Sequence, residues 1–133
     1  MVISTPYRVI YGDTDQMGIV YYANYLRLFE LGRNEYMRAV GLTYREVEER
    51  GLMLPVTHAA CKYRKSARYD DLVHVQTRIT SIRGARVHFA YEIRNEAGEL
   101  LVEGSTEHAS VDRSGRVVRL TPELVKALEP EQT

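Results

Sequence analysis

The chain has 133 residues, enough for one compact domain with its own core and too few for two of ordinary size. Lys and Arg total 18, as do Asp and Glu, so no overall basic field would attract nucleic acid or an anionic membrane surface. No apolar run reaches the roughly 20 residues of a membrane span, and the N-terminal residues lack the pattern of a signal peptide. We therefore expect a cytoplasmic protein with a single domain over residues 1–133.

The predicted elements begin with a strand and a long apolar helix. Residues 5–11 (TPYRVIY) alternate as a strand does, and Pro6 is tolerable near a strand start. From residue 22 to 40 apolar residues recur at helical spacing, and Gly41 marks the end. The apolar stripe is wide, which is typical of a helix wrapped by other structure. A shorter helix follows over residues 43–51, with a capping box formed by Thr43 and Glu46.

After this point the sequence predicts strands, over residues 52–63, 71–82, 86–95 and 99–112. Short connections with glycine turns separate them, so we expect a four-strand antiparallel meander. Residues 117–120 would extend the last hairpin, and Thr121 caps a short terminal helix that begins with Pro122. The outline is an α+β domain, with an antiparallel sheet of about five strands wrapped around a long central helix. One sheet covers only one side of that helix, so the sheet must curl around it or a second subunit must complete the cover.

The segment YGDTDQMGIVYYANY, residues 11–25, sets two aspartates ahead of the long helix. A calcium loop counted from Asp13 does not fit, because its fifth position would be Met17 and its twelfth Asn24, where an oxygen ligand and a bidentate glutamate are needed. Asp15 lies seven or eight residues before the predicted helix start, which is too far for a direct cap.

Gly18 allows the backbone to turn back between Asp15 and the helix. A turn there would hold the Asp15 carboxylate across a gap from the helix N-terminus. Such a gap suits a substrate carbonyl, because free amide groups polarise its oxygen while a carboxylate faces its carbon. The residue types alone leave a structural and a functional interpretation open.

Residues 8–30, RVIYGDTDQMGIVYYANYLRLFE, resemble the signature of hotdog-fold acyl-CoA thioesterases of the 4-hydroxybenzoyl-CoA thioesterase type. The matching features are the strand ending in Asp-Thr-Asp, the Gly-Ile-Val that starts three residues after the second Asp, and the Asn-Tyr at the helix start. Glu30 and Arg33 also resemble the pattern that continues down the helix, and downstream the match is one of layout. The resemblance implies a hotdog fold and hydrolysis of an acyl-CoA thioester to free CoA and a carboxylic acid.

Carried over by position, the resemblance implies that Asp15 is the catalytic carboxylate and that the backbone amide of Tyr22 polarises the thioester carbonyl. Gly18 then shapes the loop, and Asp13 holds it. Asp15 would either attack the thioester to form an acyl-enzyme anhydride or activate a water molecule, and the sequence leaves both routes open. Part of this family has a histidine where this chain has Tyr22, so an imidazole cannot assist catalysis from that position.

Four further residues are candidates for substrate binding. The family places pocket residues of the partner subunit near Thr57 and His58, although His58 also fits an ordinary strand histidine. Arg83 and Arg86 are candidates for binding CoA phosphates, with a solvated loop charge as the alternative for each. No histidine pair has metal-ligand spacing with a third partner, and hydrolysis of this kind is expected to need no metal or cofactor.

The resemblance also implies the assembly: a homodimer or homotetramer with its active sites at subunit interfaces. The expected partners are an acyl-CoA substrate and no nucleic acid, with no membrane insertion. Two non-catalytic alternatives remain, an acyl-CoA-binding regulatory protein and an adaptor associated with acyl carrier protein. A hotdog dehydratase is a third, less supported because such enzymes rely on a histidine in the helix region, and residues 16–30 contain none.

Overall fold

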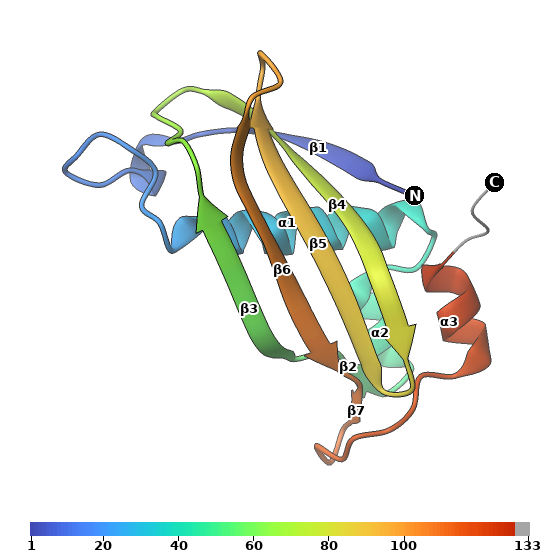
Figure 1. Cartoon of the computed structure of the whole chain (residues 1–133). Helices are drawn as coiled ribbons and strands as arrows, with labels where there is room; N and C mark the ends of the chain where they lie inside the picture. The colour runs from blue at the N-terminus through green and yellow to red at the C-terminus, as the bar shows by residue number, and fades with distance from the viewer. Residues whose placement is uncertain (130–133) are drawn as a thin grey trace.

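One antiparallel sheet and one long helix dominate the fold in a computed structural model that describes residues 1–129 (Figure 1). The last four residues of the predicted domain lie outside this described part. The elements are β1 (Ile3–Arg8), a 3-10 turn η1 (Tyr11–Asp13), α1 (Asn24–Ala39), α2 (Tyr44–Glu49), β2 (Leu52–Met53), β3 (Val56–Tyr63), β4 (Leu72–Arg83), β5 (Arg86–Asn95), β6 (Leu100–Ala109), β7 (Val111–Asp112) and α3 (Pro122–Leu128). None of these helices is long and apolar enough to cross a membrane.

The five long strands are arranged in the order β1-β4-β5-β6-β3, and every neighbouring pair is antiparallel. Strands β4, β5 and β6 form the predicted meander. The prediction that β3 joins it beside β4 is wrong, because β3 pairs with β6 at the opposite edge. Residues 64–71 make this crossing, and on the way the carbonyl of Ala67 accepts a hydrogen bond from the Val20 amide at 2.8 Å.

Two predicted strands are interrupted. The segment 52–63 splits at Pro55, which has no N–H to donate: β2 pairs with β7, and the long strand β3 starts at Val56. The segment 99–112 divides into β6 and β7 accordingly. Residues 117–120 form no strand, and only a single bridge joins Val117 to Val111. The terminal helix α3 is capped as expected, since the Thr121 hydroxyl accepts from the Leu124 amide at 3.2 Å.

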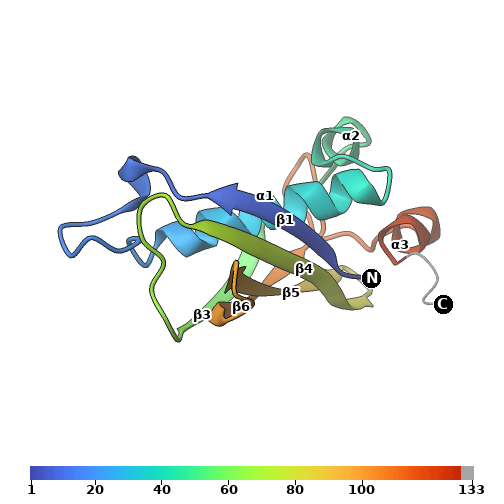
Figure 2. The same cartoon turned by 90° about the horizontal axis from the view of Figure 1, so that it is seen from above.

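Helix α1 packs across one face of the sheet (Figure 2). The contact is close because a Cβ at Gly32 would lie only 2.3 Å from the Thr77 hydroxyl oxygen. Phe29 stacks on Tyr91 of β5, with ring centroids 4.3 Å apart. The predicted α+β arrangement with a central helix is confirmed, but the sheet covers α1 on one side only. Leu26, which is 41% exposed, lies on the uncovered side.

Strand β3 is an open edge of the sheet. All its residues are exposed except Cys61, which is half-buried. An exposed strand edge presents unpaired backbone groups that a second chain can satisfy. Both the uncovered side of α1 and the free edge of β3 are therefore left for a second chain to cover, and the assembly itself stays a prediction.

Candidate active site

Residues 13–21 form a small hairpin, here called the Asp15 hairpin. Thr14 and Val20 are bridged across its two arms, and the Asp15 amide donates to the Ile19 carbonyl at 2.9 Å. Its turn closes where the Gly18 amide donates to the Asp15 carbonyl at 3.0 Å. Gly18 has φ of 78°, a conformation that glycine adopts without strain. The backbone turns back here, as the sequence predicts.

Asp13 is the buried member of the aspartate pair. Its Oδ2 accepts hydrogen bonds from the Tyr7 hydroxyl at 2.7 Å and from the Ile10 amide at 3.0 Å, and its carbonyl accepts from the Asn24 side chain at 2.9 Å. Burial, reinforced by the Asp13 carboxylate, raises the pKa of Tyr7 to about 12. Asp13 thus ties the end of β1 to the start of α1, which matches the loop-holding role expected of it.

Asp15 is more open. Its Oδ1 accepts from the Met17 amide at 2.9 Å, which leaves Oδ2 without a hydrogen-bond partner among residues 1–129. The pKa of Tyr21 is raised, first by hydrogen bonding and charge interaction with Tyr22 and then by burial. The nearby Asp15 carboxylate makes the last contribution in the same direction. A half-buried carboxylate that is fixed through one oxygen and free at the other can act as a nucleophile or a base.

The start of α1 offers the complementary group. The N-cap residue Ala23 provides no side-chain cap, and the first backbone bonds are those from Asn24 to Tyr21 at 2.9 Å and from Tyr25 to Tyr22 at 3.4 Å. The Tyr22 amide has no acceptor within the described residues. Unpaired amides at a helix N-terminus carry partial positive charge and bind developing negative charge. The Asp15 hairpin and the start of α1 lie at the same end of the molecule (Figure 1).

An aromatic cluster joins the end of β3 to this helix start. The Tyr63 hydroxyl donates to the Tyr22 carbonyl at 3.1 Å, and the Tyr63 ring lies 6.2 Å from that of Tyr22 and 5.7 Å from that of Tyr25. Tyr63 was not among the sequence candidates. It lies 41 residues from Tyr22 in the chain, and no local pattern relates two such positions.

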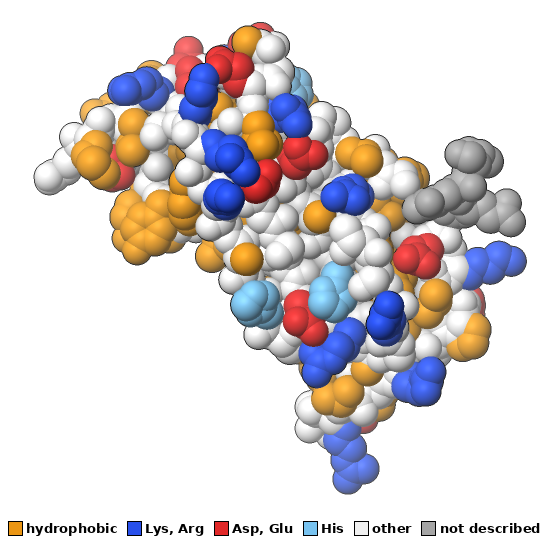
Figure 3. Space-filling view, in the orientation of Figure 1, with side chains coloured by type: hydrophobic (Ala, Val, Ile, Leu, Met, Phe, Trp, Pro, Cys, Tyr) orange, Lys and Arg blue, Asp and Glu red, His pale blue; other side chains and the backbone are white. Residues whose placement is uncertain are grey.

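The other predicted site residues do not lie beside Asp15 within one chain. Thr57 and His58 are at the start of β3, the end farther from the Asp15 hairpin (Figure 1). His58 pairs in register with Glu107. Histidines and charged side chains of both signs are spread over the sheet face that Figure 3 shows. Arg83 and Arg86 flank the β4–β5 turn, also at the far end, and Arg86 donates to the Glu107 carboxylate at 2.7 Å.

One cation that the sequence did not single out lies at the hairpin. Arg68 is bridged to Ile19, and its Nη1 is 3.8 Å from where a Cβ of Gly18 would stand. Arg64 and Lys65, its neighbours in the same basic segment, are paired with Glu103 and Glu99. No ion pair of Arg68 is formed within residues 1–129. Its proximity depends on how two loops meet, which no sequence spacing reports.

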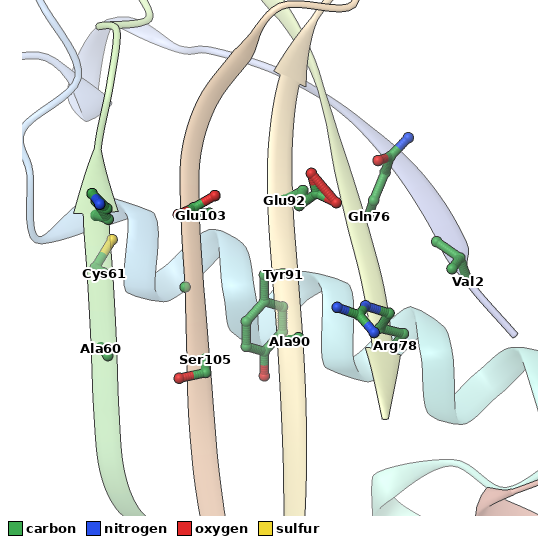
Figure 4. Close-up of a pocket in the computed structure, with 12 residues that line it drawn as sticks. Val2, Ala60, Cys61, Gln76, Arg78, Ala90, Tyr91, Glu92, Glu103 and Ser105 are labelled. Atoms are coloured by element: carbon green, nitrogen blue, oxygen red, sulfur yellow. The ribbon is translucent and has the colours of Figure 1, made fainter. Parts of the chain in front are cut away.

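Two of the large concavities on the chain are formed by the outer face of the sheet and by the two helices α1 and α2. A hollow of about 580 Å³ covers the outer face of the sheet, where Lys62, Arg78, Glu92 and Glu103 surround small residues (Figure 4). A groove of about 850 Å³, here called the α1–α2 groove, lies between the C-terminal half of α1, helix α2 and residues 54–56. Asp15 lines neither. In the described part of the chain, no cluster of His, Cys, Asp and Glu could hold a metal ion.

Comparison with known proteins gives one consistent picture. A family model described as the thioesterase-like superfamily matches residues 9–128. The acyl-CoA thioesterase YbgC of Haemophilus influenzae is 36% identical over 126 residues, covering 93% of this chain and 91% of that protein. A solved DHNA-CoA thioesterase from Staphylococcus aureus has a TM-score of 0.90 at 34% identity, covering 95% of this chain and 87% of that one. A variant of 4-hydroxybenzoyl-CoA thioesterase has a TM-score of 0.87 at 22% identity, covering 96% and 99%, which confirms the predicted hotdog fold.

Proposed function

This chain belongs to the thioesterase-like superfamily and is a hotdog-fold thioester hydrolase, and from that premise we propose that it hydrolyses an acyl-CoA thioester through the Asp15 carboxylate. The observation that carries the residue assignment is the free Oδ2 of Asp15 at the end of the molecule where the Tyr22 amide is unpaired. The expected likeness to thioesterases of the 4-hydroxybenzoyl-CoA type is confirmed at the level of the family.

The proposed reaction uses the two groups in complementary ways. The Tyr22 amide donates to the thioester carbonyl oxygen and stabilises the negative charge that develops on it. In one route, Asp15 takes a proton from water while the water oxygen attacks the carbonyl carbon, the C–S bond breaks and the CoA thiolate takes up a proton. In the other, Asp15 attacks the carbon itself, the C–S bond breaks and the CoA thiolate leaves and takes up a proton. Water then hydrolyses the resulting anhydride to the carboxylic acid and the free Asp15 carboxylate. Both routes need the carboxylate ionised.

The rest of the site is proposed to come from a second subunit. If the free edge of β3 pairs antiparallel with its own copy, the start of one strand lies beside the end of the other. Thr57 and His58 of one subunit would then approach the end of β3 and the adjoining helix start of its partner. This pairing accounts for the separation of these residues from Asp15 within one chain. Dimer or tetramer formation and the cytoplasmic location stay predictions.

The phosphates of CoA are bound by cationic side chains, and three arginines are proposed to bind them. Arg83 and Arg86 remain candidates from the sequence, although Arg86 already pairs with Glu107. Arg68 joins them because it lies against the Asp15 hairpin without a carboxylate partner in the part of the chain described. Guanidinium groups bind phosphate oxygens in pairs of parallel hydrogen bonds.

The test is free-thiol release from aryl, short-chain and long-chain acyl-CoAs, with wild type, Asp15→Asn and a matched control, Asp70→Asn. The Asn side chain retains an oxygen that can accept from Met17, so the hairpin turn should persist. Loss of the carboxylate should lower kcat about 100-fold or more. Asp70 is exposed and its carboxylate lies 3.9 Å from Arg8, so its variant should keep the wild-type rate.

Two outcomes would overturn the proposal. One is an Asp15→Asn variant that keeps most of the wild-type rate. The other is a wild-type protein that releases no CoA from any substrate. Capture of acyl carrier protein without turnover would then favour the adaptor alternative.

A further inference from the structure

One arginine of the α1–α2 groove, Arg33, differs from the others in its surroundings. The groove is lined by arginines from α1 and α2, by two exposed glutamates and by the apolar residues Leu54, Pro55 and Val56. Arg38 faces Glu35 at 3.5 Å and Arg45 faces Glu49 at 3.4 Å, and both arginines are largely exposed. Arg33 is half-buried and has no carboxylate within 4.0 Å among residues 1–129.

A chain of hydrogen bonds connects Arg33 to side chains of β5 and β6 and to the Leu54 carbonyl. Its Nη1 donates to the Tyr91 hydroxyl at 3.2 Å, which lies 2.6 Å from the Thr106 hydroxyl, and that hydroxyl lies 2.8 Å from His108 Nε2. His108 Nδ1 lies 2.9 Å from the Leu54 carbonyl. A guanidinium only donates and a carbonyl only accepts, so every proton in the chain points from Arg33 toward Leu54. The other guanidinium N–H groups are left for a ligand in the groove.

In the proposed β3–β3 dimer, the α1–α2 groove of one subunit would face the Tyr22 amide of the other. The twofold axis of an antiparallel edge pair is perpendicular to the sheet, so both α1 helices lie on the same face. The groove ends at residues 54–56, the start of β3, which the pairing sets beside the partner subunit's Tyr63. Within each chain Tyr63 is hydrogen-bonded to Tyr22. A thioester held at the partner subunit's Tyr22 amide would therefore extend its acyl group into this groove.

Resting on the proposed function, we propose that the α1–α2 groove is the acyl compartment of the shared site and that Arg33 selects acyl groups ending in a carboxylate. The substrates would be mono-CoA thioesters of dicarboxylic acids. The methylene groups would pack on Leu54, Pro55 and Val56, and the terminal carboxylate would bind Arg33 through charge-assisted hydrogen bonds. Glu30, one turn earlier on α1 and also lining the groove, opposes this by repelling the same carboxylate.

The test compares pairs of substrates of equal carbon number, glutaryl-CoA with valeryl-CoA and adipyl-CoA with hexanoyl-CoA. The readout is the ratio of kcat/KM within each pair, which does not depend on the fraction of active enzyme. Wild type should favour the carboxylate member about tenfold, since a hydrogen bond to a charged group is worth roughly one factor of ten. Arg33→Met should abolish this preference, and Glu30→Gln should increase it.

Three controls make the result specific. Arg45→Met removes a paired cation from the same groove and should leave the ratio unchanged. Arg33→Lys keeps the charge without the forked geometry and should give an intermediate ratio. Thermal melting shows whether each variant is folded. A wild-type preference for the neutral substrates, or an unchanged ratio in Arg33→Met, would overturn the inference while the proposed function stands. Absence of turnover on all four substrates would also overturn the inference, whereas the proposed function is overturned only if the wider acyl-CoA panel gives no turnover either.

Discussion

At the scale of single residues, His108 links folding to pH. It is 2% exposed on the inner face of β6, and burial lowers its pKa from 6.5 to about 4, although its contact with the Leu54 carbonyl works in the opposite direction. The unfolded chain therefore binds a proton at a higher pH than the folded protein does, so stability falls as pH drops from 6.5 toward 4. At pH 5 the expected loss from this residue is about 2 kcal/mol of unfolding free energy.

The check is urea unfolding of wild type and His108→Gln between pH 7 and 5. Glutamine is neutral and can both donate and accept, so the variant should lose far less stability over this range than wild type. The range stays above the pKa of ordinary carboxyl groups, which confines the comparison to histidines. Equal pH dependence in the two proteins would show that His108 is protonated as readily in the folded state as in the unfolded chain.

The two aspartates show how much of the site residue types can reveal. The spacing in the sequence argued against a calcium loop, and it predicted the turn that the structure has at Gly18. Asp13 and Asp15 were separated only by the family resemblance, because an aspartate before a helix has many structural uses. In the structure, the distinction rests on the partners of each carboxylate: Asp13 is satisfied by Tyr7 and Ile10, whereas Asp15 keeps one oxygen free.

At the scale of elements, Gly104 sets how closely α1 and β3 approach β6. A Cβ there would lie 2.4 Å from the Ala60 carbonyl oxygen and 2.6 Å from the Phe29 ring. The first neighbour is backbone within the β3–β6 pairing, so it cannot move without disturbing the sheet. Gly104→Ala should cost about 3 kcal/mol of stability and lower the melting temperature by roughly 10 °C, with faster amide exchange in β3.

Gly12→Ala is the matched control. Its Cβ would meet nothing within 4 Å and its φ lies outside the left-handed region, so it should melt like wild type. A Gly104→Ala protein with the same melting temperature and β3 exchange as this control would mean that Phe29 and β3 can shift freely.

The strands show where sequence reasoning about elements ends. The hairpins joining β4, β5 and β6 were predicted because their turns carry local signals at Gly84 and Gly98. The placement of β3 was not, because it depends on contacts between distant segments. One is the bond between the Val20 amide and the Ala67 carbonyl, which holds the crossing loop against the Asp15 hairpin.

At the scale of the whole molecule, the proposed site residues are divided between the two ends of one chain. The free carboxylate and helix amide lie at one end of β3, while Thr57, His58 and the α1–α2 groove lie at or near the other. An open strand edge runs between the two ends. In the proposed dimer, an antiparallel twofold would join each end to the complementary end of a partner and so create two complete sites from two half-sites.

Mixed dimers test this arrangement directly. Asp15→Asn and Arg33→Met proteins are unfolded together, refolded at equal concentration and assayed with adipyl-CoA. A shared site takes residue 15 from one subunit and residue 33 from the other. Each mixed dimer therefore has one site with both substitutions and one site with neither. Random pairing makes half the dimers mixed, so about a quarter of all sites should regain wild-type activity.

A site built within one chain gives a different result. Every Asp15→Asn chain would then be inactive and every Arg33→Met chain impaired, whatever its partner. The mixture would show only the average of the two separate proteins, and that average would contradict the twofold arrangement. Activity above the average identifies the regained sites as those between subunits.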